Sequence, residues 1–517
     1  MNKIKTFQFD SVETKSMRTF SEWKIFLFGV VPPLLIAVFL YFSILKDDLF
    51  GDEFLQYRWS VLGESPYGSL LIFDINAQFA KLGYLLFREP WALRLHSIIF
   101  SLGAIILIYI VAKHLFGTVT AIFATWLAAL SPYILEFAAE ARPNAIFIFA
   151  GIFFLYSLLL LLQNENWLHT FLLAFSACFG LLARPMFISI FIFGIGYYIF
   201  VRRKITRKLI IVMLSVIPCI FLIGYQMAIF STFGPKEPSD VPVLVSNLLL
   251  RLPVAFTYGY STMNYPERDI GWNIAVSKVL LHNPGLFIIC MVVFCALIIG
   301  FIQFFKKDRN KSIFLAGAVF FPILIMIAIQ ETGFSILNEK HCAGVVGAWY
   351  ILLAAGLVQT SRYLWGKFAI ALYIFLIGIS LYHFYFQPEI YSRRSNFTAL
   401  NSFLTETINE DDVLLAFHFS PERVPDYLPV LDNAGHYVDL YSDIPHDITV
   451  SDYVASKIKN CIGKIYLIYD SRLRPGIDPD NDILSFLKNH YEYKIKNYGR
   501  NLKLYEFSEQ KLISEHL

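Results

Sequence analysis

The sequence predicts a polytopic α-helical membrane protein of about eleven transmembrane helices with a C-terminal soluble α/β domain. Three observations predict this fold class. The 517 residues are 56% hydrophobic and 17% aromatic but only 16% charged, whereas soluble domains carry about 25% charge. Apolar runs of ~20 residues, the length that crosses a bilayer, recur as far as residue 386. Beyond that point the chain is more polar and alternates short helical and extended patterns.

The apolar runs predict the individual spans in order. The first run lies too deep in the chain to be a cleaved signal, and no small-residue cleavage site follows it. Arg184–Pro185 interrupts a longer apolar stretch and divides it into two short runs. The predicted spans are 25–45, 94–114, 118–136, 144–163, 167–183, 186–201, 208–230, 285–305, 312–330, 342–359 and 367–386.

Basic residues in the short connections predict how the chain is oriented. They occur in the N-terminal tail, in loops 202–208 (RRKITRK) and 306–311 (KKDRNK), and around residue 362. All of these segments fall on one side of the membrane, and such loops are typically cytoplasmic. We therefore expect an integral inner or plasma membrane protein whose N-terminus is cytoplasmic and whose C-terminus is extracytoplasmic. The large outer loops are then 46–93 and 231–284.

Charge divides the sequence into two predicted domains. Residues 1–392 have a net charge of +8 and residues 393–517 a net charge of −5. Helical and extended patterns alternate in the second part, which predicts an α/β sandwich with a partly parallel sheet. No GxGxxG or P-loop motif is present there. We expect this domain to pack on the membrane part or to help bind an acceptor. Its predicted helices are Asn396–Ile408, Pro421–Leu431, Val450–Asn460 and Asp482–His490, and its predicted strands are Val413–Phe417, Tyr437–Tyr441, Ile465–Tyr469, 491–497 and 502–507.

Composition also excludes several classes of function. A net charge of +3 argues against a nucleic-acid binder. The six cysteines form no CxxC pair, which argues against a cysteine zinc site. Ion-coupled transporters carry ionisable groups near the bilayer midplane, and the spans of this chain have almost none. The informative polar residues instead gather near the predicted outer surface.

The first polar cluster follows the first span and contains Asp47–Asp48 and Gly51–Asp52–Glu53. A carboxylate so close to an apolar span is partly desolvated, and a positioned carboxylate can act as a general base. Neighbouring helical residues do not share a face, so only one of Asp52 and Glu53 points at a given centre. The alternative to a general base is that these acids are ordinary surface residues at a solvated helix end. Composition alone favours this alternative.

The second polar cluster lies in the outer loop 131–143. Glu136 and Glu140 are four residues apart and would share a helical face. The nearby Arg142 has the chemistry to bind a phosphate through paired hydrogen bonds. A local Arg–Glu pair that caps the loop is an equal alternative.

The third polar cluster is Lys340–His341, just before the span 342–359. These side chains could meet a lipid phosphate, or they could anchor the span end at the interface by snorkelling. Arg184 has the same two interpretations. The segment Leu70–Phe87 is apolar with a narrower polar side and is expected to lie in the interface plane. Loop 231–284 has a similar character, so the two segments predict a groove through which a lipid-linked substrate enters.

Three sequence segments together resemble a known superfamily. They are GDE at 51–53, EPWALRLHSIIFSLGAIILIYIVAKHLFG at 89–117, and SPYILEFAAEARPNAIFIFAG at 131–151. The chain resembles the GT-C superfamily of polyprenyl-phosphate-sugar-dependent glycosyltransferases, in the branch of the protein O-mannosyltransferases and the lipid A transferases. Two departures stand out: the family's aromatic residue after the ARP segment is Asn144 here, and the late span HCAGVVGAWY lacks the family's Arg–Tyr pair and proline.

The resemblance implies an inverting hexosyl- or pentosyltransferase acting at the outer face on a glycolipid, glycan or protein hydroxyl. It implies that Asp52 is the catalytic base with Glu53 beside it, and that Glu140 and Arg142 belong to the outer cavity. It places Lys340 or His341 nearest the lipid phosphate. A polyprenyl-phosphate-linked sugar is the expected donor, and the sequence offers no convincing metal constellation. The alternatives are a lipid or small-molecule transporter or flippase without catalysis, and an assembly protein whose outer domain binds partners.

Overall fold

A computed structural model gives the fold of two compact units, each of which is described by itself. The first unit consists of Met1–Lys46, Gln56–Met263 and Trp272–Leu381, and the second of Asp47–Leu55, Asn264–Gly271 and Tyr382–Leu517. The structure describes residues 20–49, 52–63, 74–233, 252–257, 259, parts of 291–306, 308–330, 339–387, 396–416, 436–440, 449–459, 461–470, 482–498 and 502–510.

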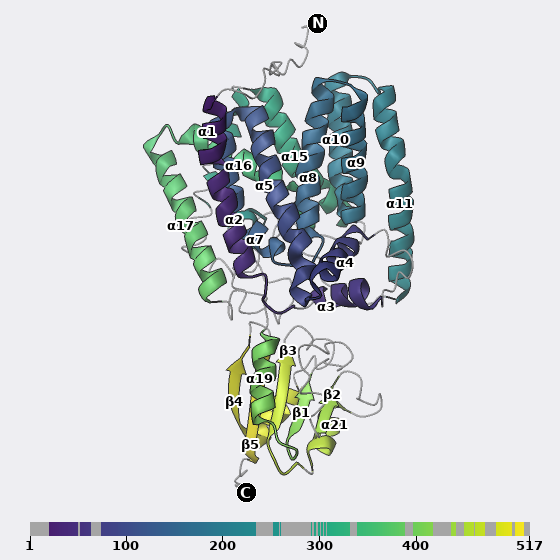
Figure 1. The fold of residues 1–517 in the computed structure, drawn as a ribbon, viewed down its shortest axis with the longest axis vertical. Coiled ribbons are helices and arrows are strands. Elements are labelled where there is room, and N and C mark those ends of the chain that lie inside the picture. Colours follow the sequence, from purple (N-terminus) through teal and green to yellow (C-terminus); the bar gives the residue numbers. More distant parts are fainter. Residues whose placement is uncertain are drawn as a thin grey trace. The chain divides into compact units, whose positions relative to one another are not determined.

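The first unit is a bundle of long apolar helices (Figure 1). Eight of the described helical segments are long and apolar enough to cross a membrane, or nine if one bent pair is a single span. The helices of the described part are α1 (Phe20–Gly29), α2 (Val31–Ser43), α4 (Ile75–Phe87), α5 (Leu95–Phe116), α6 (Thr118–Ala129), α7 (Pro132–Ala138), α8 (Asn144–Gln163), α9 (Trp167–Ala183), α10 (Ile188–Arg202), α11 (Arg207–Phe233), α15 (Arg309–Gln330), α16 (Val346–Thr360) and α17 (Leu364–Phe386).

Every predicted span that falls within the described residues is helical, which confirms the membrane fold. The run 118–136 is the bent pair: α6 and α7 meet at 56°, where Ser131 caps α7 by accepting from the Ile134 N–H. Helix α9 is apolar but shorter than the helices that are long enough to cross a membrane. The predicted span 285–305 lies largely outside the described residues.

Short helical segments lie between the long helices, and two of them carry the predicted site residues Asp52, Glu53, Lys340 and His341. The segments are α3 (Asp52–Tyr57), the π-helical turn η1 (Arg58–Leu62), and the 3₁₀ segments η3 (Pro90–Arg94), η4 (Pro185–Phe187) and η6 (Glu339–Val345). Glycine lets η6 approach α8 closely, since a Cβ on Gly151 would lie 1.9 Å from the carbonyl oxygen of Gly344. Segment η6 is therefore held directly against the first turns of α8.

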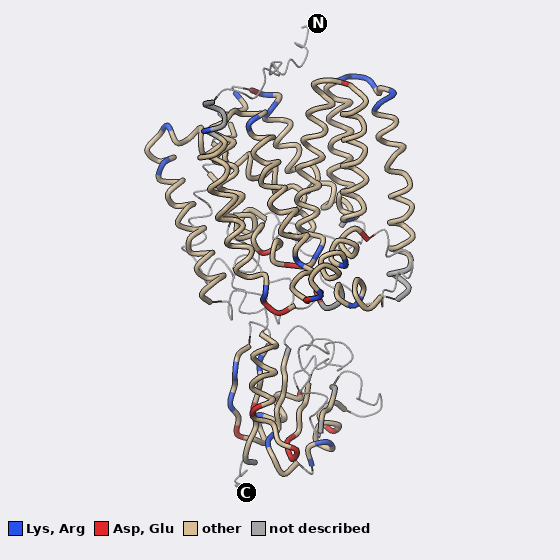
Figure 2. The backbone as a smooth tube through the Cα atoms, in the orientation of Figure 1, with Lys and Arg blue, Asp and Glu red and all other residues tan. Residues whose placement is uncertain are grey.

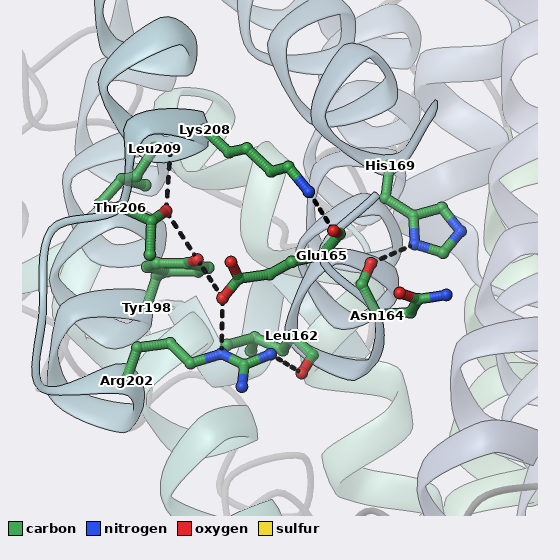
Figure 3. A network of polar contacts seen from close by, with 9 residues as sticks. All are labelled: Leu162, Asn164, Glu165, His169, Tyr198, Arg202, Thr206, Lys208 and Leu209. Carbon is green, nitrogen blue, oxygen red and sulfur yellow. Dashed lines mark hydrogen bonds and ion pairs between the residues drawn. The ribbon is translucent and has the colours of Figure 1, made fainter. Parts of the chain in front are cut away.

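The two ends of the bundle differ in charge (Figure 2). One end carries mostly Lys and Arg, most visibly in the loop between α10 and α11, whereas acids and bases occur together at the other end, near α4. Glu165 forms polar contacts at the Lys- and Arg-rich end. Its carboxylate accepts from Tyr198 Oη at 2.7 Å and pairs with Arg202 Nε at 3.1 Å. Lys208 also donates to the Glu165 carbonyl (Figure 3). This network joins the α8–α9 and α10–α11 connections and engages two of the loop's cations, so we regard it as structural.

The described strands of the second unit form one five-stranded sheet in the order β2-β1-β3-β5-β4. Strand β1 pairs in parallel with β2 and β3, whereas β5 pairs antiparallel with β3 and β4. The strands are β1 (Val413–Ala416), β2 (His436–Asp439), β3 (Ile465–Asp470), β4 (Tyr491–Asn497) and β5 (Leu502–Gln510).

Helices cover both faces of this sheet, which confirms the predicted α/β domain with a partly parallel sheet. The helices are α19 (Phe397–Thr407), α21 (Val450–Ile458) and α23 (Asp482–His490). Alternation along β1 sends Leu414 into a cluster with α19 and Leu415 into a cluster with α21 and α23. The predicted helix 421–431 lies outside the described residues.

Candidate active site

A buried polar chain begins on the short helices that follow the first span. Gln56 donates to Ser60 at 2.8 Å and accepts from the Asn76 amide at 2.8 Å. The Asn76 oxygen lies 2.8 Å from His96 Nε2, which therefore carries the proton because an amide oxygen only accepts. The chain thus links the loop after the first span with the first turn of α5.

Asn76 is a buried polar residue of the segment that was expected to lie in the interface plane. It is one of the residues on the narrower polar side of that segment, and it is 2% exposed. Helix α4 turns its small residues inward and leaves Leu82, Leu86 and Phe87 exposed. The outward surface of this helix is therefore largely apolar and also includes Lys81, a combination typical of a helix in the interface plane.

Ser97 continues the polar chain from α5 to the loop after α7. Its hydroxyl donates to the Glu140 carbonyl at 2.6 Å. Helix α7 ends at Ala138, so Glu140 lies in the turn beyond it. The expectation that Glu136 and Glu140 share a helical face is therefore wrong. Proline at position 143 follows closely, and helices tend to end before the residue that precedes a proline.

Glu140 is the centre of the second half of the chain. Its carboxylate oxygen Oε2 lies 3.9 Å from an Arg142 nitrogen and accepts from the Asn144 amide at 3.4 Å. Arg184 donates to the Asn144 oxygen and, at 3.0 Å, to the carbonyl of Lys340. Both Glu140 and Asn144 are buried. One carboxylate and two guanidinium groups are thus held together by residues from α8, η6 and the loops that precede α8 and η4.

The structure brings some of the predicted site residues together. Glu140 and Arg142 lie 3.9 Å apart and form the local Arg–Glu pair that was the alternative to a phosphate site at this loop. Lys340 joins the chain through its backbone carbonyl, and His341 follows it in η6. These residues belong to the first compact unit.

The two predicted acids of the first outer loop belong to the second compact unit. Asp52 is the first residue of α3, and its side chain lies outside the described part of the structure. Glu53, the next residue, is completely buried. Adjacent positions on a helix point in different directions, so the two acids have different surroundings.

Several residues of the polar chain were not among the predicted site residues: Gln56, Ser60, Asn76, His96, Ser97 and Asn144. Asn144 was noted only as a departure from the family pattern. The available signal was a pair of polar residues, His96–Ser97, in the first turn of an otherwise apolar span. Among the described residues no group of three His, Cys, Asp or Glu is placed to hold a metal ion.

Comparisons with known proteins agree with this architecture. Residues 76–225 match the family model described as "Dolichyl-phosphate-mannose-protein mannosyltransferase", and no curated protein matches the chain. The apo structure of ArnT from Cupriavidus metallidurans is similar with a TM-score of 0.50 and 11% identity, covering 93% of this chain and 98% of that chain. ArnT bound to undecaprenyl phosphate gives a TM-score of 0.49 at 11% identity, covering 94% and 98%.

A further similar structure is the oligosaccharyltransferase of Archaeoglobus fulgidus in complex with Zn and sulfate. It has a TM-score of 0.46 and 13% identity, and the match covers 90% of this chain and 71% of that chain. At 11% identity the likeness to apo ArnT shows the fold, and the family match covers the segment that carries α4 to α11. The chain therefore has a GT-C-like membrane fold similar to that of ArnT, and its residues 76–225 are similar to the dolichyl-phosphate-mannose-protein mannosyltransferase family.

Proposed function

We propose that this protein transfers a sugar from a polyprenyl-phosphate donor to a hydroxyl acceptor at the outer face of the membrane, with inversion at the anomeric carbon. The GT-C-like fold supports a glycosyltransferase, and residues 76–225 match a family model described as a dolichyl-phosphate-mannose-protein mannosyltransferase. One structural observation carries the proposal: the buried chain that joins Glu140, Arg142, Asn144 and Arg184 to η6.

This chain has the chemistry that a lipid-phosphate leaving group needs. Guanidinium groups bind phosphate oxygens with paired, charge-assisted hydrogen bonds. Glu140 and Asn144 fix the two arginines in place before any substrate binds, so little reorganisation is required when charge develops on the phosphate. Lys340 and His341 follow on η6 and complete the proposed cationic group. Arg142, which is 14% exposed, is partly accessible to a ligand.

Asp52 is the proposed base. It accepts the proton of the acceptor hydroxyl as that oxygen attacks the anomeric carbon from the face opposite the phosphate. The bond between the anomeric carbon and the phosphate oxygen breaks, and the phosphate leaves with the electron pair. Glu53 is proposed to contact the substrate beside the base. The acceptor is a glycolipid, a glycan or a protein, and the donor needs no nucleotide-binding motif because it is already lipid-linked.

The test is Asp52→Asn in proteoliposomes supplied with undecaprenyl-phosphate hexoses and pentoses and with hydroxyl acceptors of each class. The amide cannot take the proton, so transfer should fall by about 10²–10⁴-fold, the usual contribution of a general base. Asp308→Asn is the matched control. Asp308 caps α15 by accepting from the Lys311 N–H at 3.1 Å, and an Asn keeps that acceptor.

Wild-type transfer by the Asp52→Asn protein would contradict the assignment. Movement of the lipid across the bilayer with no transfer, by both wild type and variant, would instead favour the flippase. Product analysis by mass spectrometry separates these outcomes. It also identifies the sugar and acceptor through the mass added.

A further inference from the structure

The segment that carries Asp52 is bonded to a helix of the C-terminal domain. One Asp48 oxygen accepts from the Thr398 backbone N–H at 2.8 Å, and the other accepts from the Thr398 hydroxyl at 2.8 Å. The two residues are 350 positions apart in sequence. Both lie in the second compact unit, which unites Asp47–Leu55 with Tyr382–Leu517.

The contact satisfies the N-terminus of α19. The first N–H groups of a helix have no partner within it. Asn396 caps α19 by accepting from the Ala399 N–H at 2.9 Å, and Asp48 accepts from the preceding one, that of Thr398. A carboxylate is further favoured there by the helix dipole. The triplet Asn396–Phe397–Thr398 reads as a glycosylation sequon, yet both of its polar side chains serve this cap.

We propose that the C-terminal domain positions the catalytic loop, with Asp48 and Thr398 as the positioning residues. This inference rests on the proposed function, in which Asp52 is the base. Asp48 precedes Asp52 by four residues, a stretch that spans at most ~14 Å when extended. Helix α3 begins at Asp52. Fixing Asp48 on α19 therefore limits where the backbone of α3 can begin.

A positioning role has a distinct kinetic signature. A small displacement of a reacting group lowers the rate of the chemical step more than it lowers substrate binding. Loss of the Asp48–Thr398 contact should therefore lower kcat for transfer while leaving the KM for the lipid-linked donor unchanged. A purely structural role would lower the amount of folded protein without changing kcat per folded molecule.

The experiment compares Thr398→Val, Thr398→Ser and Thr405→Val in the full-length protein in proteoliposomes. Valine keeps the β-branched shape and removes one of the two hydrogen bonds. Removing a hydrogen bond to a charged group should lower kcat by about tenfold. Serine keeps the hydroxyl and should restore wild-type turnover. Thr405→Val is the control, since Thr405 lies on the same helix and its hydroxyl donates within that helix, to the Asn401 carbonyl at 2.8 Å.

Hydrogen–deuterium exchange gives a second readout that does not depend on catalysis. Thr398→Val should speed exchange in residues 47–57 and leave residues 482–498 unchanged, which shows that the domain remains folded. Asp48→Ala removes both acceptors from the other side of the contact and should give the same pattern.

Wild-type exchange and wild-type kcat in Thr398→Val would overturn the inference, as would faster exchange with no fall in kcat. Failure of the proposed function is recognised separately. In that case Asp52→Asn transfers sugar at the wild-type rate, whereas the exchange data still report whether α19 holds the loop.

Discussion

Two single residues show how short polar side chains organise this site. Asn144 stands where the resembling family has an aromatic residue, and its amide donates to Glu140 while its oxygen accepts from Arg184. A side-chain amide supplies both the donor and the acceptor that these two contacts need, which an aromatic ring such as phenylalanine cannot. Asp74 caps α4 by accepting from the Ala77 N–H at 3.0 Å. Burial raises the pKa of Asp74 above its usual value of 3.8, and the backbone N–H groups of Ala77 and Asn76 only partly oppose this effect.

The raised pKa of Asp74 predicts how stability responds to pH. The folded state favours the protonated acid, so ionisation of Asp74 costs stability as pH rises from 3.8 through the folded pKa. Asp74→Asn keeps the cap without a charge and should therefore gain stability relative to wild type over that window and keep the gain above it. Asp74→Ala loses the cap and should be less stable by about 1 kcal/mol.

Thermal unfolding in detergent from pH 4 to pH 8 measures these differences. The Asn variant provides the reference for the Ala variant, because both lack the ionisable group. A constant difference between Asp74→Asn and wild type across the whole pH range would contradict the effect of burial on the pKa.

At the scale of elements, the proposed lipid-phosphate group depends on how closely η6 approaches α8. Gly151 of α8 faces the backbone of Gly344, so no side chain fits between the two segments. Arg184 adds a polar contact from the α9–η4 connection to the Lys340 carbonyl. Because backbone meets backbone here, the position of Lys340 and His341 is determined by packing as well as by hydrogen bonds.

We predict that Gly151→Ala displaces η6 and lowers transfer. The added Cβ would lie 1.9 Å from the Gly344 carbonyl oxygen, and backbone cannot yield as a flexible side chain can. Gly196→Ala in α10 is the matched control, because a Cβ there meets nothing within 4 Å. It should stabilise the helix by about 0.5–1 kcal/mol.

Transfer rate and melting temperature should therefore both fall for Gly151→Ala, whereas Gly196→Ala should retain the rate and melt higher. Equal melting temperatures and rates for the two variants would show that η6 accommodates a methyl group and that its packing against α8 does not determine the transfer rate.

At the scale of the whole molecule, the charge asymmetry predicts that the C-terminal domain is extracytoplasmic. Single cysteines at Lys204, in the α10–α11 loop, and at Lys459, after α21, can be introduced in a background without native cysteines. Both positions are exposed. A membrane-impermeant maleimide added to intact cells should label Lys459→Cys, whereas Lys204→Cys should react only after permeabilisation. The reverse pattern would contradict the orientation.

The sequence predicted the elements well and the site in part, for a physical reason. A span is encoded by the composition of ~20 consecutive residues, and a strand by alternation over a few, so both can be identified locally. Glu140 and Arg142 were predicted together because they are neighbours in the chain. The Asn76–Gln56 and Arg184–Asn144 bonds join residues 20 and 40 positions apart, and nothing in the local pattern indicates such pairings.

Strand β4 has a consequence for how this protein behaves at high concentration. It is the last strand of the sheet, so one row of its backbone N–H and C=O groups has no neighbouring strand among those described. Such edges invite another chain to add itself as a further strand and start aggregation. Lys494 and Lys496 project from β4 on one face, and a second copy docking there would bring like charges together. The lysines thus oppose edge-to-edge self-association of the domain.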